Sequence, residues 1–154
     1  MIRKFSVSDR AQQKCLALIA VTFFLTSSGY LSWLYHLLRF VNSPTADLWT
    51  MGAGYCAQAV GLGLFALMMR SGDIELSGKL FGAGAAIYIA FLVPAMLSGS
   101  LPGTIIFGLL MNAACGFLAG YYLHALAVLS EGRHRALVFG VGYAIRFFDT
   151  LISQ

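Results

Sequence analysis

Five long stretches of apolar residues constrain this sequence more than any other feature. Each reaches or approaches the roughly 20 residues that an α-helix needs to cross a hydrocarbon core about 30 Å thick. None alternates apolar and polar side chains in segments of about 10 residues, as the strands of a membrane β-barrel do. The stretches therefore predict an all-α integral membrane protein, a bundle of about five transmembrane helices. They lie near residues 15–38, 48–69, 78–98, 103–129 and 136–152.

The composition excludes an ordinary water-soluble fold. Hydrophobic residues make up 59% of the 154 residues and charged residues only 10%, whereas a soluble domain carries about 25% charged residues. This number of charges is too small to cover the surface of a soluble domain of this length. Most of the surface must then contact lipid, and the bilayer is the first expected partner. The three cysteines lie inside apolar stretches, and their spacings match neither a disulfide framework nor a zinc site.

Lysine and arginine are concentrated in alternate connectors. Residues 1–14 hold four, the connector before the third stretch holds two, and the connector before the fifth holds two, while Arg39 is the only one in the remaining connectors. Because basic connectors stay in the cytoplasm, this asymmetry predicts a cytoplasmic N-terminus. Residues 1–14 are then a basic cytoplasmic segment and residues 15–154 the helical bundle. The lack of another targeting signal favours the plasma membrane.

The same basic N-terminal residues would also suit a cleaved signal peptide. The apolar stretch 15–38 is longer than the roughly 7–15 residues of a signal peptide's apolar core, which favours a retained first span. The net charge of +4 is not gathered into a basic patch with interleaved aromatic residues, so no nucleic-acid partner is expected.

Turn-forming residues predict where the helices end. Residues 42–45 (Asn-Ser-Pro-Thr) break the first helix, and Thr45 or Asp47 is the expected N-cap of the second. Pro102 suits the first turn of the fourth helix, where its missing N–H has no partner to lose.

The fourth stretch carries a small or polar residue at every fourth position. Such a ridge predicts close packing against another helix, and a substrate path along it is the alternative. Four residues turn 400°, so the ridge drifts by about 40° per step and its two ends face different neighbours. Gly78 and Gly82 repeat the pattern in the third stretch, and Thr22, Thr26, Tyr30 and Trp33 form a semi-polar stripe on the first. The ridge consists of Thr104, Gly108, Asn112, Gly116, Gly120 and His124.

Four polar or charged side chains inside the apolar stretches are the candidate substrate-path residues. Lipid cannot satisfy the amides of Gln58 and Asn112, so both should point inward, either to bond neighbouring helices or to line a path. Arg146 lies about 15 Å along the fifth stretch, and Asp149 follows on the same face. The pair could bind an anionic group and couple proton movement. Alternatively, it is an internal ion pair, or the helix ends early and Arg146 lies at the interface.

Enzyme signatures are lacking in the sequence. It contains no Gly-x-Ser-x-Gly, no His-Glu-x-x-His and no phosphate-binding glycine loop. The expected topology places His36 at the opposite membrane face from the other two histidines, so the three cannot share a metal site. We therefore expect neither an enzyme nor a cofactor or metal.

Two connectors carry short motifs. Residues 70–79 contain Arg-Ser-Gly-Asp followed by Ser-Gly-Lys, and residues 131–135 read Glu-Gly-Arg-His-Arg. In this respect the chain resembles the N-terminal half of a major facilitator superfamily transporter, although only Lys79 follows Gly78 where that family has a basic pair. The resemblance implies part of a secondary transporter that moves a small solute by alternating access, completed by further helices of a longer chain.

A non-transporting membrane module is the alternative from a different class of function. The chain would then be the sensing or anchoring region of a membrane-bound regulator, or a subunit that packs against a partner. Helix faces rich in small residues serve such a module equally well.

Overall fold

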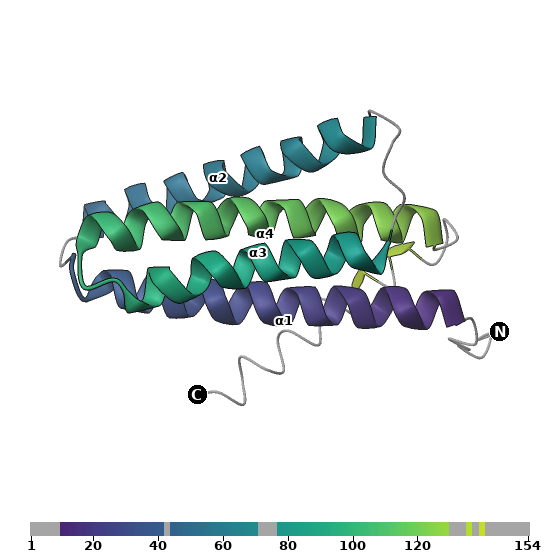
Figure 1. Cartoon of the computed structure of the whole chain (residues 1–154), viewed down its shortest axis with the longest axis horizontal. Coiled ribbons are helices and arrows are strands. Elements are labelled where there is room, and N and C mark those ends of the chain that lie inside the picture. Colours follow the sequence, from purple (N-terminus) through teal and green to yellow (C-terminus); the bar gives the residue numbers. More distant parts are fainter. Residues whose placement is uncertain (1–9, 42–43, 71–76, 130–134, 137–138, 141–154) are drawn as a thin grey trace. The chain divides into compact units, whose positions relative to one another are not determined.

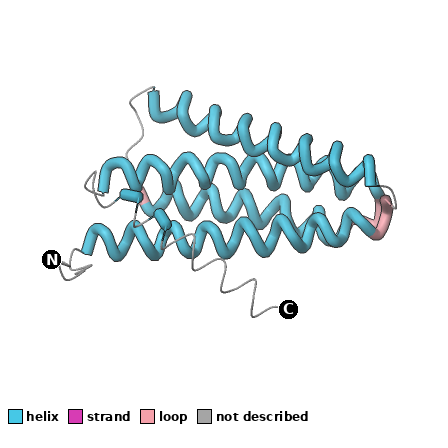
Figure 2. The backbone as a smooth tube through the Cα atoms, turned by 180° about the vertical axis from the view of Figure 1, so that it is seen from behind, coloured by secondary structure: helices cyan, strands magenta, loops and turns pink. Residues whose placement is uncertain are grey.

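A computed structural model of the chain describes residues 10–41, 44–70, 77–129, 135–136 and 139–140. Within these residues the regular structure is helical, without strands, and Figure 2 shows loops only at helix ends. Four helices are long and apolar enough to cross a membrane, which confirms the helical class for the described part of the chain. The fifth stretch, 136–152, falls almost wholly outside the described residues. The four helices, shown in Figure 1, are α1 (Arg10–Leu38), α2 (Pro44–Arg70), α3 (Gly78–Leu97) and α4 (Leu101–Leu129).

The helix boundaries differ from the expected ones at two points. Helix α1 begins at Arg10, inside the segment expected to be a cytoplasmic tail. Helix α2 begins at Pro44, ahead of both Thr45 and Asp47, so the prediction that one of these is its N-cap is wrong. The reason is that proline's fixed φ and missing N–H suit the first position of a helix.

Local side chains account for the start of α3 and for the hairpin that leads into α4. Ser77 is the N-cap of α3, and its side chain accepts a hydrogen bond from the backbone N–H of Leu80. Ser98–Ser100 form a loop of three residues, and Pro102 lies in the first turn of α4 as predicted. The carbonyl of Ser100 accepts hydrogen bonds from the backbone N–H of Thr104, at 3.0 Å, and from its hydroxyl, at 3.1 Å.

The chain divides into two compact units, which are described separately. One consists of Thr26–Tyr121, here called the 26–121 unit. The other combines Met1–Leu25 with Tyr122–Gln154 and is here called the terminal unit. In the terminal unit, the aromatic rings of Phe23, Tyr122 and Phe139 lie against one another, with centroids 5.2 to 6.5 Å apart.

In the 26–121 unit, α4 lies between α2 and α3 (Figure 1) and also contacts the end of α1. Neighbouring helices alternate in direction along the chain, so α4 runs parallel to α2 and antiparallel to α3. The buried side chains come chiefly from α4 and from the end of α1. They include Trp33, Leu37, Phe65, Tyr88, Met111, Asn112 and Leu118.

Helices α2 and α4 approach each other through two glycines. A Cβ atom on Gly61 would lie 2.7 Å from the carbonyl carbon of Ala113, and one on Gly116 would lie 2.7 Å from the carbonyl carbon of Gln58. In each case the obstacle is backbone, which cannot rotate away as a side chain can. The absence of two side chains therefore sets the distance between these helices.

We predict that Gly116→Ala destabilises the protein by about 1–3 kcal/mol, because the added methyl must push the two backbones apart. The measurement is the thermal unfolding midpoint of the purified protein in detergent. Gly82→Ala is the matched control: a Cβ there would meet no described atom within 4 Å, so it should leave the midpoint unchanged or raise it. Equal midpoints for the two variants would contradict the packing described here.

Candidate functional site

The polar centre of the 26–121 unit is a pair of amides on facing helices, here called the amide pair. Gln58 of α2 donates a hydrogen bond from Nε2 to Oδ1 of Asn112 on α4, at 2.8 Å. Asn112 in turn donates from Nδ2 to the carbonyl of Gly108, also at 2.8 Å. The Asn112 side chain is fully buried and lies against Gly54 of α2. The structure thus brings together the two predicted amides and bonds them to each other.

A second polar contact joins α1 to α4. The indole Nε1–H of Trp33 donates to the carbonyl of Thr104 at 2.9 Å, and both residues are fully buried. Gly108 makes this possible, because a Cβ at that position would overlap the indole ring. One turn nearer the end of α1, a ring nitrogen of His36 lies 3.1 Å from the carbonyl of Ser98. The ring nitrogens of Trp33 and His36 on α1 therefore lie against backbone carbonyls of the α3–α4 hairpin.

The glycine ridge of α4 changes its neighbour along the helix. Gly108 faces Trp33 of α1, whereas Gly116 faces the backbone of α2 and Gly120 faces Phe65 of α2. This is the change of direction that a drift of about 40° per four residues produces. By contrast, a Cβ atom added to Gly78 or Gly82 of α3 would have no neighbouring atom of the described residues within 4 Å.

Of the remaining predicted residues, some are buried on α1 and others lie outside the described part of the chain. Thr22, Thr26 and Trp33 of the semi-polar stripe are buried, and the Thr22 hydroxyl bonds to the carbonyl of Leu18 one turn earlier. Arg146 and Asp149 lie outside the described residues.

Tyr30 and its neighbours form an aromatic cluster that the stripe alone did not reveal. The Tyr30 ring lies 5.8 Å from that of Trp33 and stacks at 6.4 Å on Tyr55 of α2. Among the described residues, the hydroxyl of Tyr30 is a buried side-chain group without a hydrogen-bond partner. The cluster joins α1 to α2 chiefly by ring contact.

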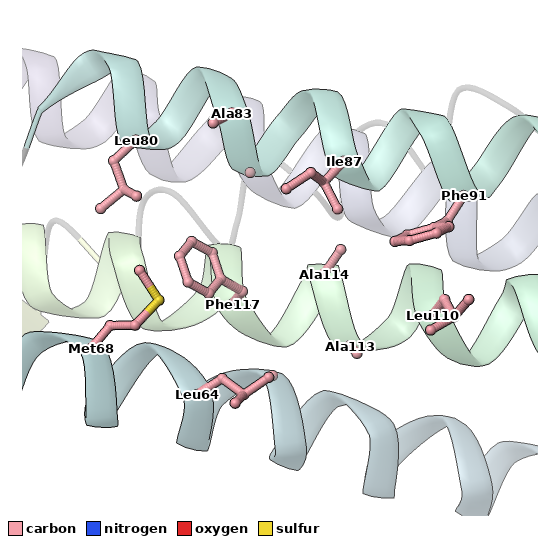
Figure 3. Close-up of a pocket in the computed structure, with 12 residues that line it drawn as sticks. Leu64, Met68, Leu80, Ala83, Ile87, Phe91, Leu110, Ala113, Ala114 and Phe117 are labelled. Atoms are coloured by element: carbon pink, nitrogen blue, oxygen red, sulfur yellow. The ribbon is translucent and has the colours of Figure 1, made fainter.

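A groove between α2, α3 and α4 is a further feature of the site that the sequence did not reveal. Figure 3 shows side chains of all three helices converging on it. Its volume is about 350 Å³, and it is lined by twelve residues, all of them glycine, alanine or larger apolar residues. They include Met68 of α2, Leu80, Ala83 and Phe91 of α3, and Ala114 and Phe117 of α4.

The groove and the amide pair offer different chemistry. The groove has no side-chain hydrogen-bond donor or acceptor of the kind a polar solute requires. The amides have such groups, but Gln58 and Asn112 are hydrogen-bonded to each other, and Asn112 is also bonded to the carbonyl of Gly108 on its own helix. The described residues also contain no group of three or more histidine, cysteine or acidic residues placed to hold a metal.

Comparison with known proteins identifies no relative: no family model, curated protein or solved structure matches the chain.

We predict a measurable coupling between Gln58 and Asn112 in a double-mutant cycle. Asn112→Ala leaves the Gln58 amide without its partner, so adding Gln58→Ala should cost less than it does in the wild-type protein. Hydrogen bonds between membrane helices couple by about 0.6 kcal/mol on average and up to about 1.7 kcal/mol. Stability of the four proteins, measured by unfolding in mixed detergent micelles, tests this. Strict additivity of the two single losses would show that the pair does not join the helices.

Proposed function

We propose that this chain is a multi-pass membrane module that anchors or senses through helix packing and apolar contacts. The observation that carries the proposal is the amide pair. The central polar side chains of α2 and α4 are bonded across the interface and so serve to hold the helices together. A bond of this kind has its full value only where water is absent.

The apolar groove supports the same proposal. A site that recognises a polar solute needs a few well-placed polar groups among its apolar walls. The groove between α2, α3 and α4 has walls of glycine and apolar side chains only. It therefore suits a hydrocarbon partner, as expected of a module that acts within the bilayer.

The orientation within this proposal rests on the charges of the connectors. Arg70 and Lys79 lie at the ends of α2 and α3 that adjoin one connector, whereas the Ser98–Ser100 loop at the opposite end of α3 is uncharged. The rule that basic connectors remain inside then puts the N-terminus in the cytoplasm and the Ser98–Ser100 loop outside. A plasma membrane location belongs to the same proposal.

Cysteine labelling tests whether the amide pair is dry. With the three native cysteines replaced by alanine, Asn112→Cys and Gln58→Cys should resist a membrane-impermeant thiol reagent applied from either side. Gly99→Cys, in the exposed loop between α3 and α4, is the control and should label rapidly in intact cells but not in inverted vesicles. Rapid labelling at residue 58 or 112 would mean a water-filled path and would contradict the proposal. Labelling of Gly99→Cys only in inverted vesicles would reverse the orientation.

A second candidate is the N-terminal half of a secondary transporter of the major facilitator type. It is favoured by the connector motifs and by the charged pair Arg146 and Asp149 within an apolar stretch. A small solute would pass along α4 and the fifth stretch, with further helices completing the path.

The transporter candidate predicts that the charged pair is needed for transport. In the full-length protein reconstituted in liposomes, Arg146→Ala and Asp149→Asn should each abolish uptake from a panel of small charged solutes under a proton gradient. Phe139→Leu is the control and should leave uptake unchanged. A wild-type protein that moves none of the solutes, or variants that retain full uptake, would argue against this candidate.

A further inference from the structure

The groove between α2, α3 and α4 is long and narrow. On α3 its lining residues extend from Leu80 to Phe91, which is about 16 Å along the helix axis at about 1.5 Å per residue. This is about half of the roughly 30 Å hydrocarbon core, the depth of one leaflet. The groove thus follows the helix axes from near the start of α3, and in a bilayer crossed by α3 it would extend over about one leaflet.

The groove is narrow as well as long. Its volume of about 350 Å³, spread over about 16 Å, corresponds to a mean cross-section of about 22 Å², whereas a helix 10 Å across needs about 80 Å². A helix could therefore cover the groove but not enter it. A thin apolar chain can lie within it, and acyl chains are the thin apolar molecules that a bilayer supplies in excess.

The walls of the groove are correspondingly apolar. Leu80, Ile87 and Phe91 of α3 face Leu64 and Met68 of α2, and the floor is formed by the Ala113–Phe117 part of α4 (Figure 3). Gly84 of α3 is buried where α3 meets this floor, and a Cβ atom added to it would lie within 3.6 Å of the side chains of Phe117 and Leu118. An acyl chain would replace contact with mobile lipid by contact with fixed side chains on three sides.

Two cationic residues stand at the helix ends that adjoin the Leu80 end of the groove in the sequence. Lys79 immediately precedes Leu80, and Arg70 follows Met68 by two residues. Both cationic residues are exposed at the helix ends. The connector between them also contains Asp73 and Glu75, which lie outside the described residues. Long basic side chains at this level can extend to the lipid headgroups while their stems remain on apolar surface.

We propose that the groove holds one acyl chain of an anionic phospholipid, whose phosphate is bound by Arg70 and Lys79. The inference rests on the membrane location proposed above and names the partner of the apolar groove. Apolar walls select the acyl chain, and the two cations select the charge of the headgroup. The module would thereby respond to the lipid composition of the leaflet that adjoins the α2–α3 connector.

Native mass spectrometry of the full chain, released from detergent with added lipid, tests the proposal. Phosphatidylglycerol should bind at one molecule per chain and more strongly than phosphatidylcholine with the same acyl chains. Ala83→Phe fills the groove and should reduce bound phosphatidylglycerol at least tenfold. Ala86→Phe adds the same ring to an exposed position of α3 outside the groove, and should leave binding unchanged. Arg70→Gln and Lys79→Gln should each lower the preference for the anionic lipid about fivefold, the effect of about 1 kcal/mol per basic residue.

Equal lipid retention by the wild-type protein and a folded Ala83→Phe variant would overturn the proposal, as would equal binding of the two lipids. A phospholipid with a photoreactive group in its acyl chain gives a test that needs no variant. Crosslinks should concentrate on residues 80–91 of α3 and 61–68 of α2, and an even spread over the lipid-exposed surfaces of all four helices would contradict the site. Cysteine labelling at residues 58 and 112 reports on the amide pair alone, so the two proposals can fail separately.

Discussion

The contact of α2 and α4 at Gly61 and Gly116 sets the arrangement of the 26–121 unit. Each glycine lies against the backbone of the opposite helix, at Ala113 and at Gln58 respectively. Two helices that meet this closely gain dispersion contacts between main chains, which matter in lipid because burial of apolar side chains gives no advantage there. Their closeness also brings the Gln58 and Asn112 amides within hydrogen-bond distance. The polar contact thus depends on the absence of two side chains.

The buried polar atoms of this unit follow one rule. Each amide, indole or ring nitrogen at the centre of the helices has a partner on a neighbouring helix or one turn away on its own helix, as with Trp33 and the carbonyl of Thr104. In hydrocarbon an unbonded polar group costs several kcal/mol, so such bonds are required once these residues are placed inside. The buried hydroxyl of Tyr30 departs from the rule among the described residues, and the ring of this residue packs against Trp33 and Tyr55.

The sequence was sufficient to predict the helices but not the groove. Apolar length predicted four stretches that the structure describes as helices, and the spacing of Gly108 and Gly116 predicted that the ridge of α4 would turn from one neighbour to another. The start of α2 at Pro44 was missed because the polar residues nearby looked like better caps, whereas proline's own geometry decided the boundary. The groove was missed for a different reason. Ala83 and Ala114 are ordinary residues within their own helices. They line a groove only because α2 and α3 lie apart, one on each side of α4. One available signal was the run of small residues on facing helices. Small side chains let two helices approach closely, and they also leave space where the helices separate.

The short loop between α3 and α4 has a consequence for how the protein is made. Three residues, two serines and a glycine, join the helices, and none of them carries a charge. Three residues are too short to span the bilayer, so one helix cannot insert fully while the other stays outside. Moving it through hydrocarbon also avoids the penalty of about 2.5–3.5 kcal/mol that a charged residue would add. The two helices can therefore be inserted as a single hairpin during synthesis, and α4 can reach the membrane already beside one of the helices it will pack against.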